Sequence, residues 1–186
     1  MEIYIQNKGD NMNIKTIKVG CLNTNCYILE KDNKCLVIDP GDEIDKILAN
    51  IKYEVVGILL THRHFDHVGA LSDLVKYSNA TVYDYDNLKE GINIIEPFTF
   101  LVIYTPGHTK DSISFYFKED KVMFTGDFLF HGDTGRTDLL TGSDEDMRES
   151  IDKIKKYDDN IKIYPGHEES STLGEEKKNN ISFWCK

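Results

Sequence analysis

Three histidines and an aspartate follow directly after a short apolar run, about one third of the way along the chain. The run, Val55-Val56-Gly57-Ile58-Leu59-Leu60, predicts a buried strand. The next residues are Thr61-His62-Arg63-His64-Phe65-Asp66-His67. Open α/β sheets place their ligands at the carboxyl ends of strands, and neutral imidazole is the commonest protein ligand for borderline metals. The cluster therefore predicts a metal site at a strand end and favours an α/β fold.

The spacing of these side chains predicts two metal positions. His62 and His64 are two residues apart in extended chain, so they point to the same side. Asp66 and His67 come where the chain begins to turn, so they can face a second point in space. One ion can bind the first pair and another ion the second. The alternative is a polar loop that happens to be rich in histidine, but three of the six histidines of the chain lie here.

Three more metal-competent side chains come just after predicted strands. His108 ends the segment Thr105-Pro106-Gly107-His108, Asp127 ends Thr125-Gly126-Asp127, and His167 ends Tyr164-Pro165-Gly166-His167. Each of the three, taken singly, is more often a turn residue that makes local hydrogen bonds. Because five of the six histidines lie at strand ends, a joint role as ligands is favoured. His131 lacks this setting and is left out of the expected ligand set.

The order of these motifs resembles that of the metallo-β-lactamase superfamily, in its branch of glyoxalase II-like hydrolases. The shared motifs are H-x-H-x-D-H, a His after T-P-G, an Asp after T-G and a His after Y-P-G, with further likeness at residues 20–29, 38–41, 135–138 and 174–180. The resemblance covers nearly everything from about Asn13 onward. It implies an α/β fold of the αββα sandwich type in one domain, residues 13–186. Residues 1–12 are then an N-terminal extension, with Met12 as an alternative start.

The resemblance also implies a complete ligand set for two divalent ions. His62, His64 and His108 would hold the first ion; Asp66, His67 and His167 would hold the second; Asp127 would bridge the two. Zinc is expected first, with iron and manganese as alternatives, because nitrogen and oxygen ligands suit all three. Since this set needs no thiolate, Cys26 is not expected to bind metal.

A two-metal centre predicts hydrolysis. A water shared by two cations ionises near neutral pH, and the bridging hydroxide is the expected nucleophile. A thiolate leaves without a strong general acid, and the motifs offer no dedicated proton donor apart from the bound water and Asp66. We therefore expect a binuclear hydrolase of a small thioester or ester, with Asp66 as a catalytic residue.

Two alternatives to the hydrolase stay open. One is a mononuclear iron persulfide dioxygenase of the same superfamily, which binds iron through two histidines and one aspartate; the other is a non-catalytic metal-binding module. Longer glyoxalase II enzymes carry a further helical domain that helps to bind glutathione, and this chain ends roughly where the metal-binding domain does. A glutathione substrate is therefore not assumed.

Two residues outside the ligand set are candidates for supporting roles. Arg136, on a loop after Asp127, is a candidate for binding a substrate carboxylate bidentately, and its alternative is a surface ion pair with Asp133 or Asp138. Asp39 is a candidate for orienting a ligating histidine through the other ring nitrogen, and its alternative is a local turn.

Composition excludes several classes of partner. The formal net charge of −10 disfavours a nucleic-acid substrate, since phosphate binding requires a basic track. No apolar stretch approaches a membrane span, and the polar N-terminal sequence does not resemble a signal peptide, so a cytoplasmic protein with a small-molecule substrate is expected. The four cysteines lack C-x-x-C spacing and are expected to be free thiols. The oligomeric state stays open.

Hydrophobic periodicity predicts two strand-rich halves that each carry helices. Antiparallel strands are expected at 14–19, 26–30 and 35–39, helices at 42–51 and 67–77, and a loop or hairpin at 84–96. A strand is expected before His108, then a strand pair at 112–117 and 122–125, a helix at 144–157 and a last strand at 161–164.

Overall fold

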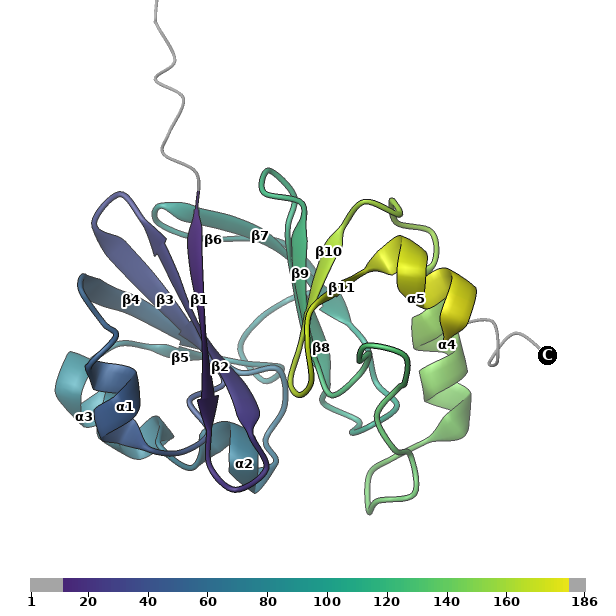
Figure 1. The fold of residues 1–186 in the computed structure, drawn as a ribbon, viewed down its shortest axis with the longest axis horizontal. Coiled ribbons are helices and arrows are strands. Elements are labelled where there is room, and N and C mark those ends of the chain that lie inside the picture. Colours follow the sequence, from purple (N-terminus) through teal and green to yellow (C-terminus); the bar gives the residue numbers. More distant parts are fainter. Residues whose placement is uncertain (1–11, 181–186) are drawn as a thin grey trace, which may run out of the picture.

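Two β-sheets packed face to face form the centre of the protein in its computed structural model, which describes residues 12–180 (Figure 1). The first sheet has the order β1-β2-β3-β4-β5 and the second β11-β10-β9-β8-β7-β6. The first sheet consists of β1 (Asn13–Val19), β2 (Thr24–Lys31), β3 (Lys34–Ile38), β4 (Glu54–Leu59) and β5 (Val82–Tyr83). The second consists of β6 (Gly91–Ile95), β7 (Phe98–Tyr104), β8 (Ile113–Phe117), β9 (Val122–Gly126), β10 (Lys162–Pro165) and β11 (Ser171–Thr172).

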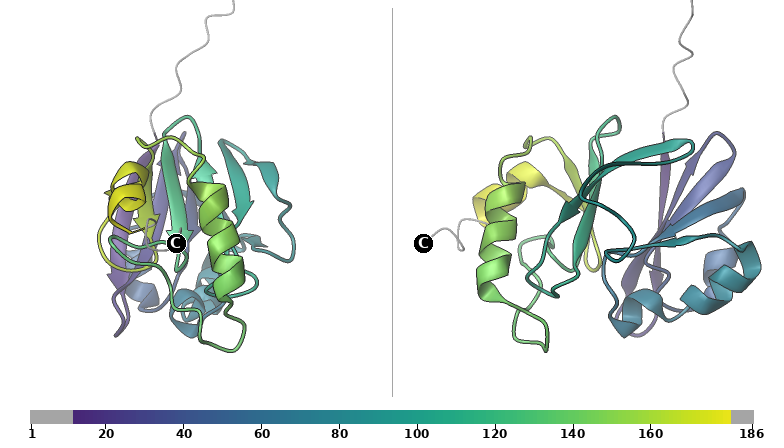
Figure 2. Two further views of the ribbon diagram at one scale, coloured as in Figure 1. Left: turned by 90° about the vertical axis from the view of Figure 1, so that its right-hand side faces the viewer. Right: turned by 180° about the vertical axis from the view of Figure 1, so that it is seen from behind.

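Helices cover the outer face of each sheet (Figures 1 and 2). The first sheet carries α1 (Ile44–Leu48), α2 (Phe65–Val68) and α3 (Leu71–Ser78), and the second carries α4 (Asp144–Ile154) and α5 (Leu173–Asn179). The layers are thus helix, sheet, sheet and helix, which confirms the predicted single-domain αββα sandwich. No helix among residues 12–180 is long and apolar enough to cross a membrane.

Side-chain alternation along the strands produces three separate hydrophobic layers. In β2, Tyr27 and Leu29 point between the sheets, while Cys26 and Ile28 point toward the outer helices. The layer between the sheets is rich in phenylalanine, including Phe115 from the second sheet, and a fully buried Phe contributes about 1.5–3 kcal/mol. Because alternate side chains of a strand point to opposite faces of the sheet, one strand contributes side chains to two hydrophobic layers.

Two parallel strand pairs determine the position of the polar residues that follow the strands. Strand β3 pairs in parallel with β4, and β9 pairs in parallel with β10. The other pairs among β1, β2 and β3 are antiparallel, as predicted. In each parallel pair the carboxyl ends lie side by side, so residues that follow these strands meet at one end of the sandwich.

Two predicted helices differ from the structure for local reasons. The expected helix at 42–51 is only α1, because Glu43 has a positive φ of 49° and Ala49 ends the helix. The expected helix at 67–77 is split into α2 and α3. Its break comes at Ala70, whose amide donates to the Pro40 carbonyl at 3.0 Å instead of continuing the helix.

The other elements match the predictions except in detail. Residues 84–96 form a loop followed by β6, which pairs with β7 as a hairpin. The helix predicted at 144–157 ends at Ile154, and α5, which begins with a capping box at Thr172 and Glu175, was not predicted. The proposed extension at 1–12 lies outside the described residues except for Met12, which is buried between the sheets.

The described cysteines are free thiols, as expected. Cys21 is exposed, and Cys26 and Cys35 are buried. Burial raises the pKa of the Cys26 thiol far above its ordinary value and that of Cys35 to about 12. Cys26 packs in the layer under the outer helices, so its thiol is not a metal ligand. Cys185 lies outside the described residues.

Glu30 provides a test of how one buried ion pair stabilises the first sheet. Its carboxylate, 7% exposed, accepts hydrogen bonds from Lys15 Nζ at 2.5 Å and Asn13 Nδ2 at 2.8 Å. Burial alone would raise the pKa of Glu30, but the hydrogen bonds from Lys15 and Asn13 and the charge of Lys15 together outweigh burial and lower the pKa. We predict that Glu30→Gln lowers the free energy of unfolding by about 1–2 kcal/mol at pH 7.

The pH dependence of that loss has a definite sign. Because the folded-state pKa of Glu30 is below the unfolded one, its contribution is present above the unfolded pKa and disappears as the pH falls through the folded pKa. The free energies of unfolding of Glu30→Gln and wild type, measured with urea, should therefore converge as the pH falls through the lowered pKa of Glu30. The control is Glu119→Gln, whose side chain is 82% exposed and should change nothing. Equal stability of Glu30→Gln and wild type at pH 7 would contradict the prediction.

Candidate metal centre

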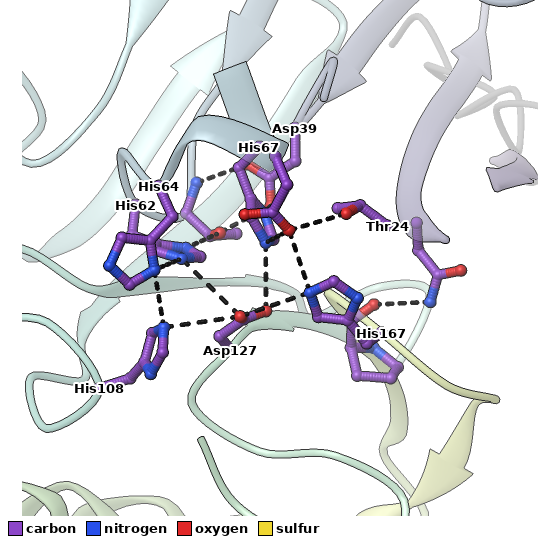
Figure 3. Close-up of polar contacts among 12 residues, drawn as sticks. Thr24, Asp39, His62, His64, His67, His108, Asp127 and His167 are labelled. Atoms are coloured by element: carbon purple, nitrogen blue, oxygen red, sulfur yellow. Dashed lines mark hydrogen bonds and ion pairs between the residues drawn. The ribbon is translucent and has the colours of Figure 1, made fainter. Parts of the chain in front are cut away.

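All seven predicted ligands meet at one end of the two sheets (Figure 3). They come from five separate places in the chain: His62 and His64 after β4, Asp66 and His67 in α2, His108 after β7, Asp127 after β9, and His167 after β10. The structure sorts them into two groups, the first formed by His62, His64, His108 and Asp127 and the second by Asp66, His67 and His167. Within each group the candidate ligand atoms lie within 4.8 Å of one another.

The first group surrounds one point with imidazole nitrogens. His64 Nδ1 lies 3.1 Å from His62 Nε2 and 2.9 Å from His108 Nε2. Asp127 Oδ2 lies 3.5 Å from His108 Nε2 and 3.9 Å from His62 Nε2. Three nitrogens and one carboxylate oxygen thus converge.

The second group adjoins the first through the same aspartate. Asp66 Oδ2 lies 3.5 Å from His67 Nε2 and 3.2 Å from His167 Nε2. Asp127 reaches this group with both oxygens, since Oδ1 lies 3.2 Å from His67 Nε2 and Oδ2 lies 3.5 Å from His167 Nε2. Asp127 is therefore the one carboxylate that faces both groups.

Oxygen acceptors bind the imidazole nitrogens that point away from the two groups, and they thereby fix the orientation of the rings. His108 Nδ1 donates to the Arg136 carbonyl at 2.8 Å, and His167 Nδ1 donates to the Leu22 carbonyl at 3.2 Å. Thr61 Oγ1 donates to Asp39 at 2.6 Å, so it accepts from His62 Nδ1 at 3.1 Å. With the proton on the outer nitrogen, neutral His62 and His108 present the lone pair of Nε2 to the interior.

This arrangement fits a cation better than it fits hydrogen bonding. The Nε2 lone pairs of His62 and His108 both face His64 Nδ1, which can donate to only one of them. His67 Nε2 and Asp127 Oδ1 are buried and form no hydrogen bond, although 3.2 Å separates them. Unpaired buried polar atoms are costly, and a divalent ion satisfies several at once. The nitrogen and oxygen donors fit zinc, iron or manganese.

Burial and charge shift the imidazole pKa values in opposite directions. Burial and the charge of neighbouring imidazoles hold the pKa of His62 well below its ordinary value and lower that of His64. Burial opposes a charge on His67, but the carboxylates of Asp39 and Asp127 outweigh it and raise this pKa to about 10. The pKa of His167 is raised to about 9 because Asp127 and Asp66 outweigh burial.

The two site carboxylates are shifted the other way. Burial would raise the pKa of Asp66 and Asp127, but hydrogen bonding to His167 and the neighbouring charge of His67 lower both below the ordinary value. Both are therefore carboxylates at neutral pH. Protons on the imidazoles and divalent cations compete for the same positions beside them.

The remaining predicted residues have mixed placements. Asp39 lies where it was expected, with Oδ2 3.0 Å from His67 Nδ1. The Arg136 side chain is exposed and pairs bidentately with Asp138 at 2.6 and 2.7 Å, which was its stated alternative, so carboxylate binding by Arg136 stays a prediction. His131 is exposed and belongs to neither group.

Sequence reasoning missed the residues that support the ligands. Thr24 Oγ1 donates to Asp66 Oδ2 at 2.8 Å, and the carbonyls of Leu22 and Arg136 hold His167 and His108. Gly166 passes so close to the site that a Cβ there would collide with Asp127 Oδ1 and lie 2.7 Å from His67 Cε1. The Pro-Gly before His167 carried a signal for Gly166, whereas a backbone carbonyl leaves no trace in the sequence.

Comparison with known proteins identifies the family. Two overlapping segments, residues 19–90 and 83–167, match the family model described as the metallo-beta-lactamase superfamily. The chain belongs to this superfamily. An alignment of 203 positions with the probable metallo-hydrolase YqgX of Bacillus subtilis (strain 168) shows 33% identity and covers 90% of this chain and 96% of that protein. An alignment of 205 positions with the hydroxyacylglutathione hydrolase GloC of Haemophilus influenzae also shows 33% identity and covers 91% of this chain and 97% of that protein.

Solved structures of the superfamily share the fold along nearly the whole chain. The BLEG-1 B3 metallo-beta-lactamase aligns with a TM-score of 0.87 and 29% identity, covering 91% of this chain and 99% of that chain. TTHA1623 in a di-iron-bound form gives 0.84 and 30%, covering 89% and 98%. ETHE1 from Myxococcus xanthus gives 0.83 and 28%, covering 91% and 83%. The comparisons thus identify a metallo-hydrolase of this superfamily, although the names of its neighbours span more than one activity.

Gly166 offers a direct test of the geometry of the centre. We predict that Gly166→Ala lowers the metal content to less than about half of the wild-type value, because the methyl group displaces Asp127 and His67. The control is Gly132→Ala, where φ is 80°, so the added Cβ strains the backbone, but no atom lies within 4 Å of it. Metal analysis with circular dichroism checks both variants. Wild-type metal content in a folded Gly166→Ala protein would refute the proposed positions of the ligands.

Proposed function

We propose that this superfamily member is a binuclear metal-dependent hydrolase of a small thioester or ester, of the glyoxalase II type. The observation that carries the proposal is the position of Asp127, whose carboxylate faces both groups of candidate ligands. A carboxylate in that position can bridge two ions. The hydroxyacylglutathione hydrolase GloC, which aligns over 97% of its own length, supports a thioester as the substrate class.

Each site residue has a distinct role in this proposal. Two ions held by these residues would supply an ionised water as the nucleophile and positive charge for the oxyanion. Asp127 holds the two ligand groups at a common centre, and the outward hydrogen bonds of His62, His108 and His167 keep their inner nitrogens directed at it. Asp39 does the same for His67.

Asp66 is the residue proposed to accept a proton during the reaction. It is only partly buried, and Thr24 fixes one of its oxygens. Because its pKa is lowered, Asp66 is ionised at neutral pH and accepts a proton rather than donating one. A thiolate leaving group, whose ordinary pKa is about 8.5, needs no donated proton, and this again favours thioesters over amides.

The types of ligand atom support a proposal for the identity of the metal. Five imidazoles and two carboxylates suit zinc, and TTHA1623, a neighbour solved in a di-iron-bound form, supports iron as the alternative. Arg136 holds the Asp138 carboxylate bidentately, the geometry in which it would hold a substrate carboxylate in its place.

A second candidate function is persulfide oxidation at a single iron. The first group alone contains more than the two histidines and one aspartate that such a site requires, and this observation keeps the candidate open. It leaves the second group without a role, although His67 and His167 are oriented by their own outward hydrogen bonds. The complete second group therefore favours the hydrolase over both the dioxygenase and a non-catalytic module.

The Asp127→Ala variant tests whether this carboxylate bridges two metal ions. We predict that Asp127→Ala loses both metals, because its carboxylate is the one that faces both groups, whereas His131→Ala retains them. Elemental analysis of the purified variants gives the number of ions per chain. About two metals per chain in Asp127→Ala would remove the bridge from the proposal.

The reaction itself is tested without oxygen. We predict that the metal-loaded protein hydrolyses an S-acyl small thiol under argon, and that His167→Ala loses about a hundredfold or more in kcat because the second group is incomplete. A dioxygenase would instead need oxygen and would tolerate His167→Ala. Turnover that appears only with oxygen and a persulfide would replace the hydrolase by the dioxygenase.

A further inference from the structure

Asn25 is a buried polar side chain to which the proposed chemistry gives no role. It lies near the start of β2 and is 1% exposed. Its Nδ2 donates to the Pro165 carbonyl and to the Glu168 carbonyl, each at 3.0 Å. Its backbone N–H donates to the Gly166 carbonyl at 2.7 Å. One residue of the first sheet therefore holds the chain on both sides of His167, which follows the second sheet.

The two acceptors determine the orientation of the Asn25 amide. Both partners of Nδ2 are carbonyl oxygens, so a rotated amide would place Oδ1 against them. Oδ1 itself is buried and forms no hydrogen bond. Because an unpaired buried oxygen is costly, this side chain is best explained by the two hydrogen bonds that its Nδ2 donates.

The chain leaves its regular strand just before His167. The register between β9 and β10 shifts at Tyr164 and Pro165, and Pro165 has no N–H to donate to the sheet. Glu168 has a φ of 65°, in the left-handed region, which a residue with a side chain adopts only when its surroundings hold it there. The hydrogen bond from Asn25 to the Glu168 carbonyl holds this conformation.

The hydrogen bonds from this end of β2 reach only one of the two ligand groups. The Leu22 carbonyl, in the turn before β2, accepts from His167 Nδ1 at 3.2 Å, and Thr24 Oγ1 donates to Asp66 Oδ2 at 2.8 Å. In the described part of the chain, no residue from 20 to 27 forms a hydrogen bond with a ligand of the first group. The second group is thus attached to β2, and the first group is not.

We propose that Asn25 is a positioning residue that sets the affinity of the second ligand group for its ion. Its hydrogen bonds fix the backbone from Pro165 to Glu168, and this determines where His167 Nε2 lies relative to Asp66. The inference rests on the proposed binuclear centre and goes beyond it. Binding of the second ion depends on a contact between the two sheets that the first ion does not need.

The direct test replaces Asn25 by leucine, which has a similar shape but no side-chain N–H. The backbone bond to Gly166 remains, and both bonds from Nδ2 are lost. Titration of the metal-free protein with Zn²⁺ against a chromophoric chelator gives the two dissociation constants. We expect Asn25→Leu to weaken binding of the second ion by about 10–100-fold, as is typical for groups that orient metal ligands, and to leave the first ion within about threefold.

A double-mutant cycle assigns the loss to His167. In a His167→Ala protein the segment no longer carries a ligand, so adding Asn25→Leu should change Zn²⁺ binding no further. In the protein that retains His167, the same substitution should weaken the second ion. An equal effect of Asn25→Leu with and without His167 would show that Asn25 acts on the whole centre, and this result would overturn the inference.

Glu30→Gln is the matched control for a general loss of stability. Glu30 lies toward the other end of the same strand and stabilises the first sheet through Lys15. Its variant should bind both ions as the wild type does. If Asn25 only stabilised the fold, Asn25→Leu would weaken the two ions alike, and that outcome overturns the inference.

A second substitution keeps the inference testable if Asn25→Leu does not fold. Asn25→Ser retains a polar side chain, but its hydroxyl is too short to reach the carbonyls of both Pro165 and Glu168. We expect a folded Asn25→Ser protein, checked by circular dichroism, to lose affinity for the second ion only. Wild-type affinity for both ions in that protein overturns the inference.

The inference and the proposed hydrolysis fail on different measurements. The two Zn²⁺ dissociation constants decide the role of Asn25, whatever the loaded protein hydrolyses. A protein that loses the second ion in Asn25→Leu but hydrolyses no thioester as wild type supports the inference and removes the hydrolase. A thioester hydrolase whose second ion is unaffected by Asn25→Leu keeps the proposed function and overturns the inference.

Discussion

The carboxylate of Asp39 is the buried charge on which the candidate centre depends. It accepts hydrogen bonds from Thr61 N at 2.8 Å, Thr61 Oγ1 at 2.6 Å and His67 Nδ1 at 3.0 Å. These bonds join the end of β3 to the end of β4 and to α2. A buried charge is costly unless it is paired and hydrogen bonded, and here three donors offset that cost. The φ of Asp39 is 50°, a conformation that aspartate tolerates better than most residues, and it directs the carboxylate inward.

The architecture brings the two halves of the site together from opposite sheets. Strands β3 and β4 end at one side of the centre, and β9 and β10 end at the other, so the ligands of each group come from both sheets. Ions bound there would link the two halves of the sandwich, and their binding free energy would add to the stability of the fold. With ions bound, the centre would stabilise the fold as well as hold the candidate ligands in place.

The sequence was most informative where side-chain identity and strand pattern coincide. His62 could be placed because it follows an apolar run, and His108 and His167 because each follows a predicted strand and a Pro-Gly turn. The layer order could be stated from the family resemblance but not from periodicity. The split of the helix at Ala70 could not be predicted, because it depends on a hydrogen bond to Pro40, which lies in another part of the chain.

The supporting contacts were beyond sequence reasoning because they join distant segments. Leu22 holds His167 across 145 positions, and Arg136 holds His108 across 28, each through a backbone carbonyl that any residue would provide. A lone pair can face the centre only if the opposite ring nitrogen carries the proton, so these carbonyls determine which atom of each ring can bind a cation. The ligand chemistry of the chain therefore depends on its folded backbone as much as on the residues of its motifs.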